Sequence, residues 1–87
     1  MASYKLLIKP SAGKELAAVD SKPDRQRIVS KIQGLSESPR PHGSEKLAGY
    51  SDRYRVRQGS FRVICLIDDD KGEVTIYKIG NRKDVYR

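Results

Sequence analysis

The stretch from Tyr54 to Ile67 constrains the fold most, because it predicts two alternating strands joined by a two-residue turn. Gly59 can supply the positive φ that the first position of a type II′ turn needs, with Ser60 second. Such a turn fixes which residues of the two strands face each other. The predicted pairs are Gln58 with Phe61, Arg57 with Arg62, Val56 with Val63, and Arg55 with Ile64.

The two faces of this predicted hairpin differ in character. Side chains alternate along a strand, so Arg55, Arg57 and Arg62 share one face. The other face carries Tyr54, Val56, Val63 and Cys65. Like charges directly opposite each other destabilise a strand pair, so stability alone does not explain Arg57 opposite Arg62. A bound polyanion would remove that conflict, whereas a solvated face or pairing with acidic side chains is the structural alternative.

Length and charge limit the function further. The 87 residues predict a single small domain over residues 1–87 with a compact core. Eighteen Lys and Arg against eleven Asp and Glu give a net charge of +7, which favours phosphate backbones or an acidic protein partner. The same charge also serves solubility alone.

Cysteine content and apolar runs indicate a cytoplasmic protein. Cys65 is the only cysteine, so no internal disulfide can form, and its place on the apolar strand face predicts a buried, inert thiol. The first apolar run, Leu6–Ile8, is too short for a signal peptide or a membrane span.

The part before the hairpin predicts one strand and two helices. Tyr4 to Lys9 is expected to form the strand. A first helix is expected over about residues 12–20, capped by Ser11, and a second from Pro23, ending by Ser38. Inward-facing positions at helical spacing are Leu16, Val19, Ile28, Ile32 and Leu35. Their apolar stripe must cover one face of a sheet.

The part after the hairpin predicts an acidic turn and a last strand. Asp68, Asp69 and Asp70 repel one another, which favours a solvated turn rather than a metal site. Val74 to Ile79 then forms the strand. If the turn holds two or four residues, the same face as Arg57 and Arg62 carries Thr75, Tyr77, Ile79 and Asn81. The predicted fold is α+β: an N-terminal strand, a two-helix hairpin and a three-stranded antiparallel meander, with both helices on one side of a four-stranded sheet.

Three motifs carry a family resemblance over nearly the whole chain. They are Lys46-Leu47-x-Gly49, then Tyr54-Arg55-Val56-Arg57 with Gly59 and Phe61-Arg62-Val63-Ile64, and finally Gly80-Asn81-Arg82-Lys83-Asp84-Val85-Tyr86-Arg87. With them the chain resembles the RelE/ParE toxin superfamily, specifically the RelE-type messenger-RNA interferases of type II toxin–antitoxin systems. The resemblance implies a RelE-like toxin domain that cleaves messenger RNA in the ribosomal decoding site, needs no metal or cofactor, and is silenced by a cognate antitoxin.

The resemblance also implies roles for particular residues. Arg62 and Arg57 would stabilise charge on the phosphate when the adjacent 2′-hydroxyl attacks it. Arg82 would stabilise or protonate the leaving 5′-oxygen, and Tyr86 would stack on a base or assist proton transfer. For Arg82 and Tyr86 the alternative is an ordinary charged tail.

Three positions depart from the family pattern. Arg55 and Arg57 both stand where well-studied relatives use lysine. At the position of Arg55 that lysine is often assigned to activating the attacking hydroxyl, and a guanidinium is too basic to act as a free base. Arg55 is therefore assigned to RNA binding, and the general base stays unassigned. Asn81 stands where many relatives carry histidine, a natural acid–base residue near neutral pH. The predicted RNA-binding set is completed by Asn81, Lys83 and Lys46. For Lys46, contact with the antitoxin or simple exposure to solvent are the alternatives.

Two further titratable residues and two alternative functions need to be considered. His42 lies in a loop rich in proline and glycine and is expected to be an exposed bystander, while Glu45 is a base by residue type alone. A ParE-like inhibitor of DNA gyrase would use a similar scaffold, because fold alone does not settle function. A degenerate toxin retained as an antitoxin-binding module is the third alternative.

Overall fold

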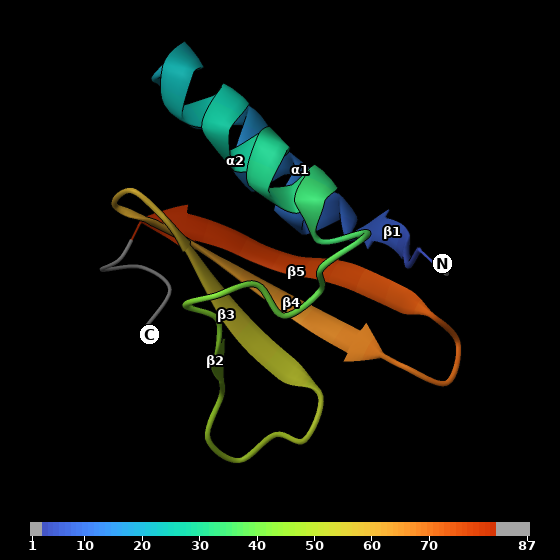
Figure 1. The fold of residues 1–87 in the computed structure, drawn as a ribbon. Helices are drawn as coiled ribbons and strands as arrows, with labels where there is room; N and C mark the ends of the chain where they lie inside the picture. Colours follow the sequence, from blue (N-terminus) through green and yellow to red (C-terminus); the bar gives the residue numbers. More distant parts are fainter. Residues whose placement is uncertain (1–2, 82–87) are drawn as a thin grey trace.

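The computed structural model describes residues 3–81, which form a five-stranded mixed sheet with two helices on one side (Figure 1). The strand order is β1-β5-β4-β3-β2, with β1 parallel to β5 and every other pair antiparallel. The elements are β1 (Lys5–Ile8), α1 (Pro10–Ala17), α2 (Lys22–Gly34), β2 (Glu45–Lys46), β3 (Arg53–Gln58), β4 (Phe61–Asp68) and β5 (Glu73–Asn81). The predicted α+β architecture, with a C-terminal antiparallel meander, is confirmed.

The sheet has one strand more than the four predicted. β2 pairs with the edge of β3, Glu45 opposite Arg55 and Lys46 opposite Tyr54. The backbone N–H of Leu47 extends this pairing with a 2.9 Å hydrogen bond to a β3 carbonyl. A two-residue edge strand is too short to show alternation in the sequence, so the segment resembled a loop.

The first helix begins earlier than predicted. Lys9 is its N-cap residue without a side-chain capping bond, and Pro10 opens the helix. Proline suits the first helical position, where its missing N–H costs no hydrogen bond, so the predicted cap at Ser11 is wrong. Pro23 lies in the first turn of α2, as predicted, and the helix begins at Lys22. The Ser21 hydroxyl caps it by accepting a hydrogen bond from the backbone N–H of Asp24 at 3.3 Å.

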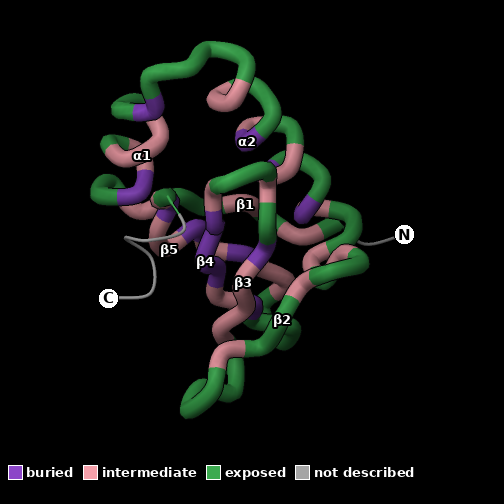
Figure 2. Tube along the Cα trace, turned by 90° about the vertical axis from the view of Figure 1, so that its left-hand side faces the viewer, coloured by how far each residue is buried: buried purple, intermediate pink, exposed green. Residues whose placement is uncertain are grey.

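A single apolar core fills the space between the helices and the sheet (Figure 2). Ile28, Ile32 and Leu35 contribute the buried face of α2, as the helical spacing predicts. The sheet contributes Val56, Val63, Cys65, Ile67, Val74, Ile76 and Ile79, which alternate along each strand except at the step from Ile76 to Ile79. The opposite sheet face carries no helix and presents the arginines.

The central hairpin has the predicted turn and register. Gly59, the first central residue of the turn, has a φ of 61°. No non-glycine residue in the described range has positive φ, so the φ of Ser60, the second central residue, is negative. Positive φ at the first position alone defines a type II′ turn, whereas type I′ needs it at both. All four predicted pairs are present, including Arg57 opposite Arg62. The turn therefore places these two arginines side by side on the sheet.

β5 contains a bulge that changes which face its end presents. Ile64 pairs with Lys78 but Cys65 pairs with Ile76, so Tyr77 is an extra residue on β5. The preceding turn has four residues, yet the bulge reverses the alternation after Tyr77. Thr75 lies on the arginine side as predicted, whereas the prediction for Ile79 and Asn81 is wrong: Ile79 is in the core, and Asn81 pairs with Phe61 on the helix side.

Candidate phosphate-binding site

Arg62 lies at the centre of the candidate site and is buried. It extends from β4 on the helix-free face, with only 3% of its surface exposed. Its Nη1 donates to the carbonyl of Phe61 at 3.4 Å, and its Nε is buried without a hydrogen-bond partner within residues 3–81. No carboxylate of the described residues forms an ion pair with it. A buried cation costs free energy unless an opposite charge compensates it, so this position is suited to an anion.

Arg57 and Arg55 flank Arg62 on the neighbouring strand. Arg57 lies directly opposite Arg62 and is exposed. Arg55, two residues back on the same face, has 15% of its side chain exposed and forms a 3.1 Å ion pair with Glu45 of β2. The predicted grouping of Arg55, Arg57 and Arg62, named here the arginine cluster, is therefore present, with one member held by a carboxylate.

The other predicted site residues lie elsewhere. Lys46 shares the side of Tyr54, away from the arginine cluster, by its register on β2. Asn81 lines a hollow between the end of β5, the hairpin turn and the α1–α2 connection. The predicted roles of Arg82, Lys83 and Tyr86 fall on residues outside the described range.

Glu15 of α1 holds the end of β5, and nothing in the local sequence indicated this. β1 pairs with β5 only as far as Ile76, which leaves the backbone beyond it without a strand on that side. The Glu15 carboxylate accepts the N–H of Ile79 at 2.9 Å and lies 3.3 Å from the Lys78 ammonium. Glu15 thereby fixes the strand immediately before Asn81.

A second long-range contact ties the connection after α2 to the β4–β5 turn. The Arg40 guanidinium donates two hydrogen bonds to Asp69, at 3.2 and 2.8 Å, and lies over the ring of Tyr54. The Tyr4 hydroxyl donates to the same carboxylate at 2.6 Å. Arg40 and Tyr4 lower the pKa of Asp69, and the neighbouring carboxylate raises the pKa of Tyr4. The run of aspartates had suggested a turn that is only solvated, but Asp69 is held by hydrogen bonds from Arg40 and Tyr4.

The family follows from the match between this chain and a known sequence family. Residues 6–86 match the model of the ParE toxin of type II toxin–antitoxin systems, parDE. The chain belongs to the RelE/ParE toxin family. It is therefore a toxin of a type II toxin–antitoxin system, as the sequence motifs implied. No protein with a curated description matches the sequence.

Solved structures of RelE toxins share the fold of this RelE/ParE toxin. The archaeal RelE–RelB complex from Pyrococcus horikoshii OT3 superposes with a TM-score of 0.81 at 27% identity, over 92% of this chain and 96% of the other. The isolated E. coli RelE toxin gives 0.79 at 27% identity, over 97% and 92%. The intact E. coli RelBE toxin–antitoxin complex gives 0.78 at 27% identity, over 91% and 96%.

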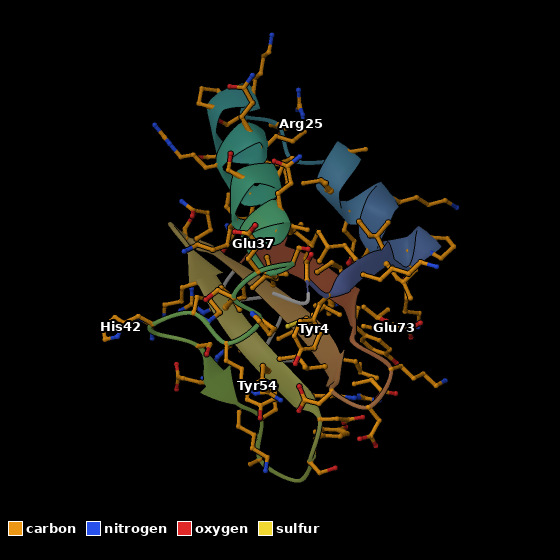
Figure 3. The ribbon with its side chains drawn as sticks, turned by 45° about the vertical axis from the view of Figure 1, so that its right-hand side comes forward. Tyr4, Arg25, Glu37, His42, Tyr54 and Glu73 are labelled. Atoms are coloured by element: carbon orange, nitrogen blue, oxygen red, sulfur yellow. The ribbon has the colours of Figure 1, made fainter. Side chains whose placement is uncertain are left out.

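The remaining chemically active side chains of this RelE/ParE toxin lie away from the arginine cluster. His42 is exposed on the connection after α2 and points outward (Figure 3). Cys65 is fully buried, and burial raises the pKa of its thiol to about 11. Within residues 3–81, no three side chains of His, Cys, Asp or Glu converge as metal ligands. No helix in the same range is long and apolar enough to cross a membrane.

Proposed function

We propose that this toxin is a ribosome-dependent endoribonuclease that cleaves messenger RNA and so inhibits translation. The observation that supports it is the pair Arg57 and Arg62, forced opposite each other by the turn at Gly59, with Arg62 buried and without a carboxylate partner in the described range. A phosphate group between the two guanidinium groups would relieve both their repulsion and the uncompensated burial.

The proposed chemistry is attack of a 2′-hydroxyl on the adjacent phosphate. The new bond joins the 2′-oxygen to phosphorus, the bond to the 5′-oxygen breaks, and the 2′-hydroxyl proton leaves while the 5′-oxygen gains one. The transition state carries extra negative charge on the phosphoryl oxygens. Arg62, which packing holds in place, would stabilise this charge without reorganisation, and Arg57 would bind the same phosphate.

Other residues would bind and orient the RNA. Arg55, held by Glu45, is assigned to orienting the ribose and phosphate, because a guanidinium retains its proton at neutral pH. Arg82 and Tyr86 are assigned to the leaving oxygen and to a base. Lys83 completes the proposed RNA contacts. Lys46 and Asn81 lie on the helix side of the sheet, away from the arginine cluster, and are left out of this proposed set.

The proposed partners are a cognate antitoxin, the ribosome and messenger RNA. RelE toxins with this fold occur in crystals with the antitoxin RelB, which supports an antitoxin partner here. The net charge of +7 favours both an acidic antitoxin segment and RNA.

Inducible expression of the wild type and the Arg62→Ala variant in bacteria tests the function. New 5′ ends on a reporter messenger RNA are mapped with and without translation. We expect cuts with the wild type only, and only during translation. Full cleavage by a folded Arg62→Ala variant would refute the assignment of Arg62, and growth arrest without cuts would refute the nuclease.

A second candidate function is inhibition of DNA gyrase. The family model that matches residues 6–86 is that of the ParE toxins, which favours this alternative. Growth arrest with DNA damage and intact messenger RNA, together with inhibition of purified gyrase, would establish it. The arginine cluster has no evident role in such an inhibitor.

A further inference from the structure

Aromatic rings and cations alternate in a row across the helix-free face of the sheet. The Lys9 ammonium lies 3.9 Å from the ring centre of Tyr77. The Arg53 guanidinium lies 4.7 Å from the centre of the same ring. Arg53 also lies 4.2 Å from the ring centre of Tyr50. Such cation–π contacts hold each ring in a defined orientation. The row continues the arginine cluster away from the hairpin turn, because Arg53 precedes Arg55 by two residues on β3.

Tyr50 is the open end of this row. It is 47% exposed, and it is the only exposed tyrosine or phenylalanine among residues 3–81. Its backbone N–H bonds to the Leu47 carbonyl at 3.3 Å, which fixes the turn that carries it. Its hydroxyl forms no hydrogen bond with any described residue. The ring is therefore positioned on one side by Arg53 while much of its surface stays available to a ligand.

The spacing of the arginines matches an extended polyanion. Arg53, Arg55 and Arg57 occupy alternate positions on β3, so consecutive members lie about 6.5–7 Å apart along the sheet. A single RNA strand that follows them from the Arg57–Arg62 pair reaches Tyr50 at its far end. Unpaired bases stack on aromatic rings, and this contact tolerates any base.

Acidic residues mark where such a strand must leave the face. A hollow beyond Arg53 is lined by Asp52, Asp68 and Glu73 together with Leu66. These carboxylates repel a phosphate backbone, so a wide duplex lying over the same end of the sheet is disfavoured. One unpaired strand that ends its contact at Tyr50 avoids them.

We propose that Tyr50, oriented by Arg53, is a base-stacking contact for the messenger-RNA strand, a few nucleotides from the phosphate held by Arg57 and Arg62. This inference rests on the proposed nuclease function. It adds a binding residue that does not take part in the chemical step and lies outside the motifs that define the resemblance.

Single-turnover cleavage on programmed ribosomes, at toxin concentrations below saturation, tests the contact. The wild type is compared with Tyr50→Phe, Tyr50→Ala and, as a matched exposed control, His42→Ala. We expect Tyr50→Ala to cleave about tenfold more slowly because one stacked base is lost. Tyr50→Phe, which keeps the ring, and His42→Ala should stay within twofold of the wild type. Thermal unfolding confirms that each variant is folded.

Messenger RNAs with one abasic nucleotide identify the stacked base. At one position near the cut, the abasic substitution should slow the wild type and abolish the difference between it and Tyr50→Ala. A Tyr50→Ala rate equal to that of an active wild type would overturn the inference alone. A deficit that persists on every abasic RNA, with weaker pelleting of Tyr50→Ala on vacant ribosomes, would also overturn it by assigning the contact to ribosomal RNA. A wild type that cuts no RNA would refute the proposed function instead.

Discussion

The carboxylate of Glu15 accepts the backbone N–H of Ile79, 64 residues later in the chain, at 2.9 Å. The contact lies where β1 no longer covers β5 and directly after the bulge at Tyr77. A side chain of α1 thus accepts the backbone hydrogen bond that a longer β1 strand would otherwise accept. It sets the position of the last described residues, from which the C-terminal segment continues.

Removal of this acceptor should destabilise the fold. We expect Glu15→Ala to lower the free energy of unfolding by about 1–3 kcal/mol, because the N–H of Ile79 loses its partner. Glu15→Gln keeps an acceptor and should cost less. Urea denaturation measures both variants, with Glu37→Ala, an exposed glutamate after α2, as the control. Unchanged hydrogen exchange of the Ile79 amide in Glu15→Ala would contradict this role.

Arg62 is expected to lower the free energy of unfolding and to be required for RNA cleavage. Arg62→Met keeps the length of the side chain but removes the buried charge, so we expect the free energy of unfolding to rise by about 1–4 kcal/mol while cleavage is lost. Arg62→Ala leaves a cavity and serves as the comparison. If Arg62→Met is destabilised as much as Arg62→Ala in urea, the guanidinium has a stabilising partner and the proposed anion site is wrong.

What the sequence predicted correctly depends on local rules. The turn at Gly59 and the alternation around it determine the pairing of Arg57 with Arg62, because both act within a few residues. The bulge left a weaker sign: the buried residues Val74, Ile76 and Ile79 step by two and then by three. A strict alternation rule overlooks such a step.

The contacts that sequence reasoning missed join distant parts of the chain. Glu15 with Ile79 and Arg40 with Asp69 are 64 and 29 residues apart, and neither pair has a local signature. The cation–π row has the same origin, because it needs the strand order of the sheet before Arg53 and Tyr77 become neighbours. Residue types alone did not reveal these three features.

Two glycines should respond oppositely to alanine. Gly59 has a φ of 61°, so Gly59→Ala should destabilise the fold by about 1–2 kcal/mol. Gly13 lies in α1 and an added Cβ would meet nothing within 4 Å, so Gly13→Ala should stabilise it by about 0.5–1 kcal/mol. Urea midpoints of the two variants should therefore shift in opposite directions. A shared direction would show that local backbone preference does not control these sites.

Cys65 should be unreactive in the native protein. Burial raises the pKa of its thiol to about 11, so little thiolate forms at pH 8 and reagents have no access. The neutral thiol is the form that the fold favours, so this contribution to stability is present below the ordinary pKa and is lost as the pH rises through about 11. Labelling with a thiol reagent at pH 8 should follow global unfolding in urea. Rapid labelling without denaturant would contradict the burial.

The Asp69 contact should give stability that depends on pH. Because Arg40 and Tyr4 lower the pKa of Asp69, its contribution is present above the ordinary carboxyl pKa and is lost as the pH falls through the lowered one. We expect Asp69→Asn to reduce the Tm slightly at pH 7, since the pair is exposed and screened, and the difference from wild type to shrink as the pH falls below the ordinary carboxyl pKa.

Arg40→Gln is the matched variant for the same contact, and its Tm deficit should follow the same pH dependence. The double variant Arg40→Gln with Asp69→Asn should have a Tm no lower than that of the less stable single variant, because each substitution removes the same Arg40–Asp69 contact. Tyr4→Phe removes the other donor to this carboxylate. Since the pKa of Tyr4 is raised, its share is present below the ordinary tyrosine pKa and is lost as the pH rises through the raised value. Additive Tm losses, or a deficit that stays constant from pH 3 to 7, would show that Arg40 and Asp69 contribute to stability independently and that Arg40 acts through its contact with the Tyr54 ring instead.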